Sequence, residues 1–209
     1  MWCDSPQSAR QCDVIRQCER HWNSKTPVKL TLIYEALCPF CQKFITQHLG
    51  SLYEEFRNNI ELELIPWGNS RFMKGGTIVC DHGPNECKAN KLQSCVLDTV
   101  KIRHALPFIV CLERSLTTNV NTEKALQHCS GFVRNNYRKI RRCFDTDRGY
   151  QLQIQAARKT ASVRPHPVPE VPYLLVNDYS PNTETNNLNI HAIRHLLKKW
   201  FRNHKRGSR

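Results

Sequence analysis

The sequence has no apolar run long enough to cross a lipid bilayer. The longest, Ala105 to Leu112, is much shorter than the roughly 20 residues that a membrane-spanning helix needs. No apolar segment of the signal-peptide type follows Met1 in the sequence as it stands. No Asn-x-Ser/Thr site occurs either, so we expect sorting or secretion by a route that does not depend on an N-glycan.

Acidic residues are scarce relative to basic ones: 18 against 31, a net charge of +13 with neutral histidines. The basic side chains gather at Arg134 to Arg142 and in residues 191–209, a segment without any acid. Such charge can attract nucleic acid, anionic membranes or acidic proteins. Because no nucleic-acid-binding motif accompanies it, we expect no nucleic-acid partner. The clusters are either solvated faces or contacts for anionic surfaces, above all through the basic C-terminus.

Cysteine, in contrast, is abundant, with 11 in 209 residues. A chain of this length can bury a core without disulfides, and cytosolic thiols gain little by pairing, so we expect an oxidising or endosomal compartment. Three cysteines near the N-terminus cannot all pair with one another, which predicts a free thiol or a disulfide-linked dimer as the alternative to a monomer. Six others can close three disulfides in several ways. These six candidates are Cys80, Cys87, Cys95, Cys111, Cys129 and Cys143.

The hydrophobic pattern predicts a strand, a helix and a second strand early in the chain. Residues 28–37 and 60–66 alternate, and 41–56 follow helical spacing, as in a parallel crossover unit. A mostly helical stretch follows over 80–142, then a helix from Asp147 to Ala161 and a strand from Tyr173 to Val176. This order predicts an α/β thioredoxin-like fold with a helical, disulfide-rich insertion. The predicted domains are a cysteine-rich segment with its linker (1–26), the thioredoxin-like domain (27–190) and a basic amphipathic helix and tail (191–209).

The segment Cys38-Pro39-Phe40-Cys41 lies where the first strand gives way to the helix. The N-terminus of a helix presents unpaired N–H groups and a positive dipole end, which stabilise a thiolate. We therefore expect Cys38 to be the exposed attacking thiol and Cys41 the more buried resolving thiol. The alternatives are an inert disulfide or half of a zinc site, which would need two further ligands.

A second group, Cys80, His82, Cys87 and Cys95, could hold zinc or form disulfides. Its cysteine spacings are wider than those of common zinc knuckles, so we favour disulfides and expect no metal. In the predicted fold, Val171-Pro172 precedes the last strand and is a candidate cis peptide bond beside the reactive pair. Its backbone groups are then expected to bind substrate together with Pro39 and Phe40.

Three motifs resemble the gamma-interferon-inducible lysosomal thiol reductase family over about residues 28–178. One is Tyr34 to Cys41 (YEALCPFC), and another is Cys143 followed by Asp147 to Leu152 (DRGYQL). The third runs from Cys80 to Cys95 (CDHGPNECKANKLQSC) and is similar to the family signature, with Asp81 where that signature has Gln. Ile65 to Asn69 is similar to the family's Pro-Tyr-Gly-Asn segment. The first 22 residues resemble a saposin A-type motif, with Trp2, Cys3, Cys12, Cys18 and Trp22.

The resemblance implies an enzyme that reduces protein disulfides at acidic pH and so aids the processing of antigens and pathogen proteins. It implies Cys38 as nucleophile, Cys41 as resolving thiol, no bound cofactor, and an external small thiol such as cysteine or glutathione as reductant. The implied location is the lysosome, endosome or phagosome, or secretion. Two alternatives stay open, a disulfide oxidase or isomerase and a cationic, non-enzymatic immune protein that binds microbial or other anionic surfaces.

Overall fold

The structure, a computed structural model, describes residues 6–11, 13, 15–16, 18–19, 27–178 and 192–206, with side chains as far as 201. The chain divides into two compact units, Met1–Val28 with Pro181–Arg209, and Lys29–Ser180. The first unit contains α1 (Pro6–Gln11) and the predicted basic helix, α10 (Ile193–Arg206). Cys18 is disulfide-bonded, and Cys3 and Cys12 lie outside the described residues. The domain boundaries at 26 and 190, and the free thiol or dimer, stay predictions.

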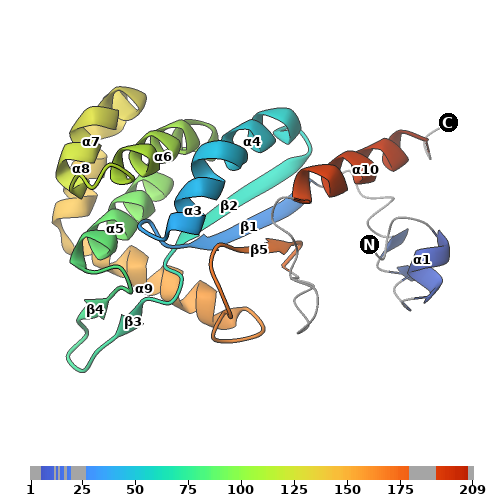
Figure 1. Cartoon of the computed structure of the whole chain (residues 1–209), viewed down its shortest axis with the longest axis horizontal. Helices are drawn as coiled ribbons and strands as arrows, with labels where there is room; N and C mark the ends of the chain where they lie inside the picture. The colour runs from blue at the N-terminus through green and yellow to red at the C-terminus, as the bar shows by residue number, and fades with distance from the viewer. Residues whose placement is uncertain are drawn as a thin grey trace. The chain divides into compact units, whose positions relative to one another are not determined.

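The sheet of the larger unit has three strands in the order β2-β1-β5. They are β1 (Val28–Tyr34), β2 (Ile60–Pro66) and β5 (Tyr173–Val176), and β5 runs antiparallel to β1. The crossover from β1 to β2 consists of α3 (Pro39–Phe44), a π-helical turn (Ile45–Leu49) and α4 (Gly50–Phe56), as Figure 1 shows. The predicted strand–helix–strand unit and the last strand are therefore present.

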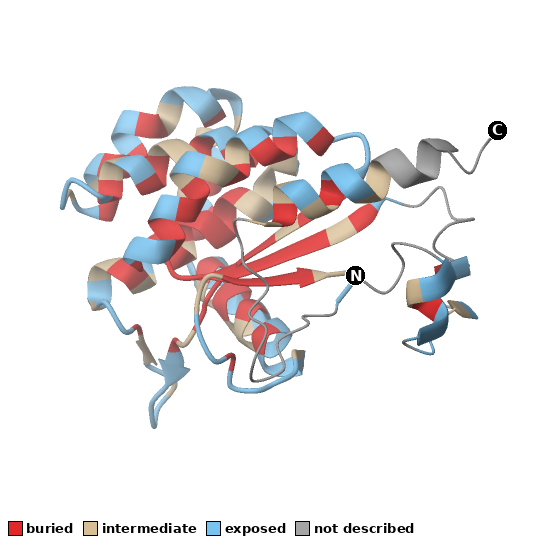
Figure 2. Ribbon diagram, turned by 45° about the vertical axis from the view of Figure 1, so that its right-hand side comes forward, coloured by how far each residue is buried: buried red, intermediate tan, exposed pale blue. Residues whose placement is uncertain are grey.

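Helices cover both faces of this sheet. The predicted helical stretch contains α5 (Pro84–Thr99), α6 (Ile102–Leu116), α7 (Thr122–Cys129), a 3₁₀ segment (Ser130–Asn136) and α8 (Tyr137–Asp145). α9 (Asp147–Ser162) packs against α5 and β2. Figure 2 shows the strands as a buried layer between the helices. One buried cluster joins the sheet to α9 and the segment that precedes β5; its residues are Ile33, Ile65, Trp67, Ala156, Val168, Tyr173 and Leu175.

Three disulfides fasten the helical insertion. Cys95–Cys143 joins α5 to α8, Cys111–Cys129 joins α6 to the end of α7, and Cys80–Cys87 closes the loop at the start of α5. The zinc alternative at Cys80, Cys87 and Cys95 is wrong, because a sulfur bonded to another sulfur is no longer the thiolate that zinc requires.

A short hairpin between β2 and α5 does not follow from the sequence pattern. Its strands, β3 (Arg71–Phe72) and β4 (Ile78–Val79), have two residues each, too few for an alternating pattern to be recognised. The hairpin carries two exposed apolar side chains, Phe72 and Met73. No helix in the described part of the chain is long and apolar enough to cross a membrane.

Candidate active site

The reactive pair lies at the start of α3. Cys38 is the N-cap residue with extended backbone (φ −67°, ψ 120°), and Pro39 occupies the first helical turn without losing a hydrogen bond. The carbonyl of Cys38 accepts the N–H of Gln42 (2.9 Å), which begins the helix. The sequence Cys-Pro-Phe-Cys therefore forms the turn by which β1 enters the helix.

The two thiols have opposite acidities. A hydrogen bond from the Cys41 thiol, then the N–H groups of Cys41 and Phe40 and the charge of His82, lower the pKa of Cys38 to about 6 against the effect of burial. Burial, followed by the hydrogen bond and charge of Cys38, raises the pKa of Cys41 far above its ordinary value. Cys38 is thus the thiolate of the pair, while Cys41 keeps its proton.

The sequence predicts an exposed Cys38, and this prediction is wrong. Its relative exposure is 5%, against 0% for Cys41. The segment before β5 covers it, since the Cys38 thiol lies 3.8 Å from the carbonyl oxygen of Val171. The Val171–Pro172 peptide bond is cis, the isomer predicted from the fold. Pro39 and Phe40 are exposed, Phe40 at 73%, so the motif presents an apolar surface beside a largely covered sulfur.

Two signature residues on α5 hold the backbone that leads into Cys38. Glu86 Oε2 accepts the N–H of Leu37 (3.1 Å), and Asn90 Oδ1 accepts the N–H of Ala36 (3.0 Å). Both side chains are fully buried. Sequence reasoning did not assign them a role, although a spacing of four residues places them on one face of a helix. The signature thus positions the reactive turn as well as supplying disulfide cysteines.

Glu35 is a buried acid at the end of β1. Its carboxylate accepts the N–H of Asn69 (2.6 Å) and fits against Gly68, where an added Cβ would lie 2.4 Å from the acid's Oε1. Burial raises the pKa of Glu35 to about 7; the charges of Glu86 and Asp81 act in the same direction, and the Asn69 N–H and His82 oppose them. Residues 67–69 (Trp-Gly-Asn) therefore bind this carboxyl group, through the N–H of Asn69 and the space left at Gly68.

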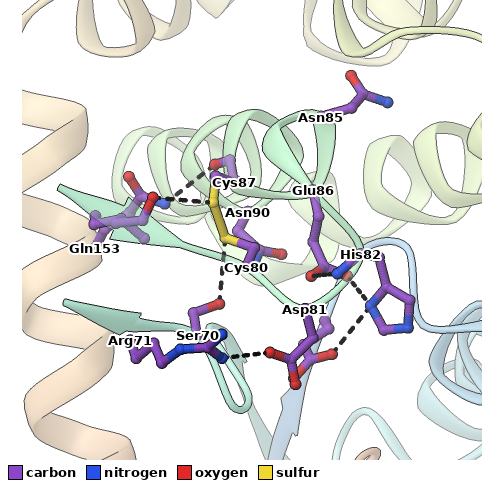
Figure 3. Close-up of a disulfide and its surroundings, with 12 residues drawn as sticks. Ser70, Arg71, Cys80, Asp81, His82, Asn85, Glu86, Cys87, Asn90 and Gln153 are labelled. Atoms are coloured by element: carbon purple, nitrogen blue, oxygen red, sulfur yellow. Dashed lines mark hydrogen bonds and ion pairs between the residues drawn. A yellow bond between two sulfur atoms is a disulfide. The ribbon is translucent and has the colours of Figure 1, made fainter. Parts of the chain in front are cut away.

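His82 lies between two buried carboxylates. Its Nδ1 is 2.7 Å from Oε2 of Glu86, which lies beside it in Figure 3. The same Nδ1 is 3.3 Å from Glu35 Oε2. Glu86 Oε1 also accepts the N–H of His82 (3.0 Å). Partial burial lowers the pKa of His82, but the two carboxylates outweigh it and the net pKa is raised.

Glu35, His82 and Glu86 are also the described residues closest to a metal-binding arrangement, with ligand atoms within 4.8 Å of one another. Both carboxylates already accept backbone N–H groups. The imidazole donates or accepts within the same cluster. Each of the three side chains therefore already has a hydrogen-bond partner within the protein.

A second buried polar chain runs from β1 to α6. The Tyr34 hydroxyl donates to Gln93 Oε1 (2.5 Å), and Gln93 Nε2 donates to Glu113 Oε1 (2.6 Å). Burial raises the pKa of both Tyr34 and Glu113 well above their ordinary values, and the charge of Cys41 or Cys38 adds to the effect. Burial therefore favours the protonated form of Glu113.

The chain is similar to known proteins over most of its length. Residues 29–132 match the family model described as gamma interferon inducible lysosomal thiol reductase (GILT). The gamma-interferon-inducible lysosomal thiol reductase of Carassius auratus is 33% identical over 181 residues, which cover 84% of this chain and 69% of that protein. The protein of the same name from Mus musculus is 31% identical over 155 residues, covering 73% and 61%.

Among solved structures, DsbA of Chlamydia trachomatis superposes with a TM-score of 0.56 at 13% identity, covering 84% of this chain and 89% of that one. This likeness concerns the fold, which is thioredoxin-like with a helical insertion. The chain belongs to the gamma-interferon-inducible lysosomal thiol reductase family of thiol–disulfide oxidoreductases.

Proposed function

We propose that this protein reduces the disulfide bonds of other proteins in an acidic compartment, such as the endosome, lysosome or phagosome, or after secretion. There it would open antigens and pathogen proteins to proteolysis. The observation that carries the proposal is the lowered pKa of Cys38, about 6, at the N-terminus of α3 beside a resolving thiol that keeps its proton.

The chemistry is two successive exchanges. The Cys38 thiolate attacks one sulfur of the substrate disulfide, forms a mixed disulfide and releases the other substrate sulfur as a thiolate. Cys41 then gives its proton to the substrate thiolate released in the first exchange, directly or through water, and attacks Cys38 Sγ. The Cys38–Cys41 disulfide forms, and the second substrate thiolate departs. Two molecules of an external small thiol such as cysteine or glutathione then reduce the Cys38–Cys41 disulfide and leave as their own disulfide.

Acidic pH makes the lowered pKa important. At about pH 5, a thiol with a pKa of about 6 is about one-tenth thiolate, whereas an ordinary thiol with a pKa near 8.5 has well under one part in a thousand. Because the thiolate is the nucleophile, Cys38 keeps a useful rate where an ordinary cysteine would be almost inert.

Substrate contact is proposed for the surface around the pair. Pro39 and Phe40 are exposed, and Phe40 offers an apolar side chain to an unfolded segment. Val171 lies against the Cys38 sulfur, so a substrate approaching this sulfur must pass Val171 and Pro172. Disulfide-bonded proteins with flexible, apolar segments fit this surface best.

The test is reduction of insulin at about pH 5 and pH 7.5, with cysteine as donor. Wild type is expected to be active at about pH 5, and Cys38→Ser to be inactive at both pH values. Cys41→Ser is expected to accumulate a mixed disulfide with insulin, visible by mass under non-reducing conditions. Full activity in Cys38→Ser would refute the assigned nucleophile.

A disulfide oxidase or isomerase is the second candidate. A lowered pKa stabilises the reduced pair and therefore makes its disulfide a stronger oxidant. Equilibration with glutathione buffers separates the two directions. A potential well above that of the glutathione couple would favour oxidation of substrates, and a potential below it favours the reductase.

We also propose contact with anionic surfaces through the cationic surface of α8 and the segment before it. Arg134, Arg138, Lys139 and Arg142 are exposed there, while Arg141 is paired with Glu123 and Asp145. Vesicles with anionic lipid should bind wild type and Cys38→Ser equally and should release both in high salt. Loss of binding in Cys38→Ser would contradict a charge-driven contact.

A further inference from the structure

The loop between β4 and α5 brings a histidine next to the reactive turn. His82 follows Cys80 and precedes Gly83 (φ +89°), after which Pro84 begins α5. The Cys80–Cys87 disulfide closes this loop, and Ser70 Oγ donates to Cys80 Sγ (3.4 Å; Figure 3). The disulfide and the hydrogen bond therefore restrain the loop that carries the imidazole.

The charged groups around His82 come from four elements. Glu86 lies on α5 and Glu35 at the end of β1, both in direct contact with the ring. Glu86 Oε2, which contacts the His82 ring, also accepts the N–H of Leu37, the residue before Cys38, at 3.1 Å. The charges of His82 and Cys38 accordingly act on each other. Asp81 precedes His82 in the loop, but its carboxylate is paired with Arg71 of β3 (2.8 Å). The charge of His82 therefore acts on Cys38 in the direction that lowers the pKa of this thiol.

We propose that His82 is a positioning residue for disulfide exchange. Its imidazolium holds a positive charge near the Cys38 thiolate, Glu86 favours the protonated ring, and Glu86 and Glu35 together keep the ring in place. The inference rests on the proposed function, since it concerns the same reactive pair. It gives a role to His82, the histidine of the signature, which the disulfides do not explain.

The charge of the cluster favours the thiolate most in acid. When Glu35 and His82 are both protonated, the imidazolium and the Glu86 carboxylate balance, and no net negative charge opposes Cys38. As pH rises, Glu35 ionises and His82 loses its proton, so the cluster becomes negative and repels the thiolate. The arrangement therefore helps Cys38 most where an ordinary thiol is least reactive.

Reciprocity supplies the decisive measurement. If the imidazolium stabilises the thiolate, the thiolate stabilises the imidazolium by the same free energy. NMR titration of His82 in the full chain should therefore give a higher pKa in the reduced protein than in the protein with the Cys38–Cys41 disulfide. An equal pKa in both states would overturn the proposal, because a purely structural histidine is indifferent to that thiolate.

The alkylation rate of Cys38, followed by mass spectrometry of its peptide, gives the matching measurement. In His82→Gln, iodoacetamide should react about 3- to 10-fold more slowly than in wild type near pH 5 and at nearly the same rate near pH 9, where the thiolate is complete. His82→Lys restores the charge and should recover most of the rate near pH 5. A rate lowered equally at both pH values, and not rescued by lysine, would indicate a structural role only.

Two controls separate this inference from other causes. His104→Gln changes an exposed histidine on α6 and should leave the profile unchanged. Insulin reduction, measured on the same samples, tests the proposed function independently. Wild type that fails to reduce insulin but keeps the redox-dependent titration of His82 would refute the reductase and leave the charge coupling intact.

Discussion

At the scale of single residues, the contact between Gly68 and Glu35 depends on the missing side chain. Gly68 has φ +57°, and an added Cβ would lie 2.4 Å from both Cγ and Oε1 of Glu35. Gly68→Ala is therefore expected to reduce the free energy of unfolding by about 2–4 kcal/mol, since overpacking adds to the strain of a left-handed alanine. Urea denaturation measures this loss.

Gly75→Ala is the matched control for Gly68→Ala. Gly75 also has a positive φ, +86°, but an added Cβ would meet nothing within 4 Å. The control should lose only about 1 kcal/mol, the backbone part of the effect. If both variants lost the same amount, the Glu35 carboxyl group would not be confined by Gly68.

At the scale of elements, the disulfides divide into one that mainly stabilises and one that mainly positions. Cys95–Cys143 closes a separation of 48 residues and Cys80–Cys87 one of 7. By chain entropy, replacing the first pair with alanines should cost about 4 kcal/mol and replacing the second about 2–3 kcal/mol. Urea denaturation of the two double variants tests this order.

Removal of the two disulfides should affect activity in the opposite order to stability. The Cys80–Cys87 loop contains both His82 and Glu86, whereas Cys95–Cys143 joins helices further along the insertion. At a temperature where both double variants are folded, removal of Cys80–Cys87 should therefore lower insulin reduction more. A greater loss of activity without Cys95–Cys143 would mean that the loop does not position the reactive turn.

At the scale of the whole molecule, the sequence predicts the elements better than the contacts between them. Alternation and helical spacing identify β1, β2, β5 and the helical insertion, because each signal lies within one continuous segment. The two-residue strands of β3 and β4 give no such signal. The pairing of six cysteines, and the meeting of Glu35, Gly68 and His82, depend on segments distant in sequence. The burial of Cys38 has the same cause, since the covering residue, Val171, lies 133 positions away.

Buried acids should make the folded protein most stable in mildly acidic solution. In the unfolded chain Glu113 and Glu35 ionise near their ordinary pKa of 4.5, whereas in the folded state burial raises the pKa of Glu35 to about 7 and that of Glu113 well above 4.5. Their contribution is therefore complete below pH 4.5 and is lost as pH rises through the folded pKa values. His82, with its raised pKa, acts in the same direction.

Glu63 has the opposite dependence on pH. Burial raises its pKa, but the pairs with Lys159 and Lys29 outweigh it and the net pKa is lowered, so its contribution disappears only below 4.5. The oxidised protein, in which Cys38 does not titrate, should accordingly melt several degrees higher at about pH 5 than at about pH 8. Glu113→Gln, which replaces the acid by an amide that does not titrate, should reduce this difference, and Glu63→Gln should leave it unchanged. Calorimetry of the three proteins decides the matter: a melting temperature that rises from pH 5 to pH 8, or a difference that survives Glu113→Gln in full, would mean that Glu113 is ionised inside the fold.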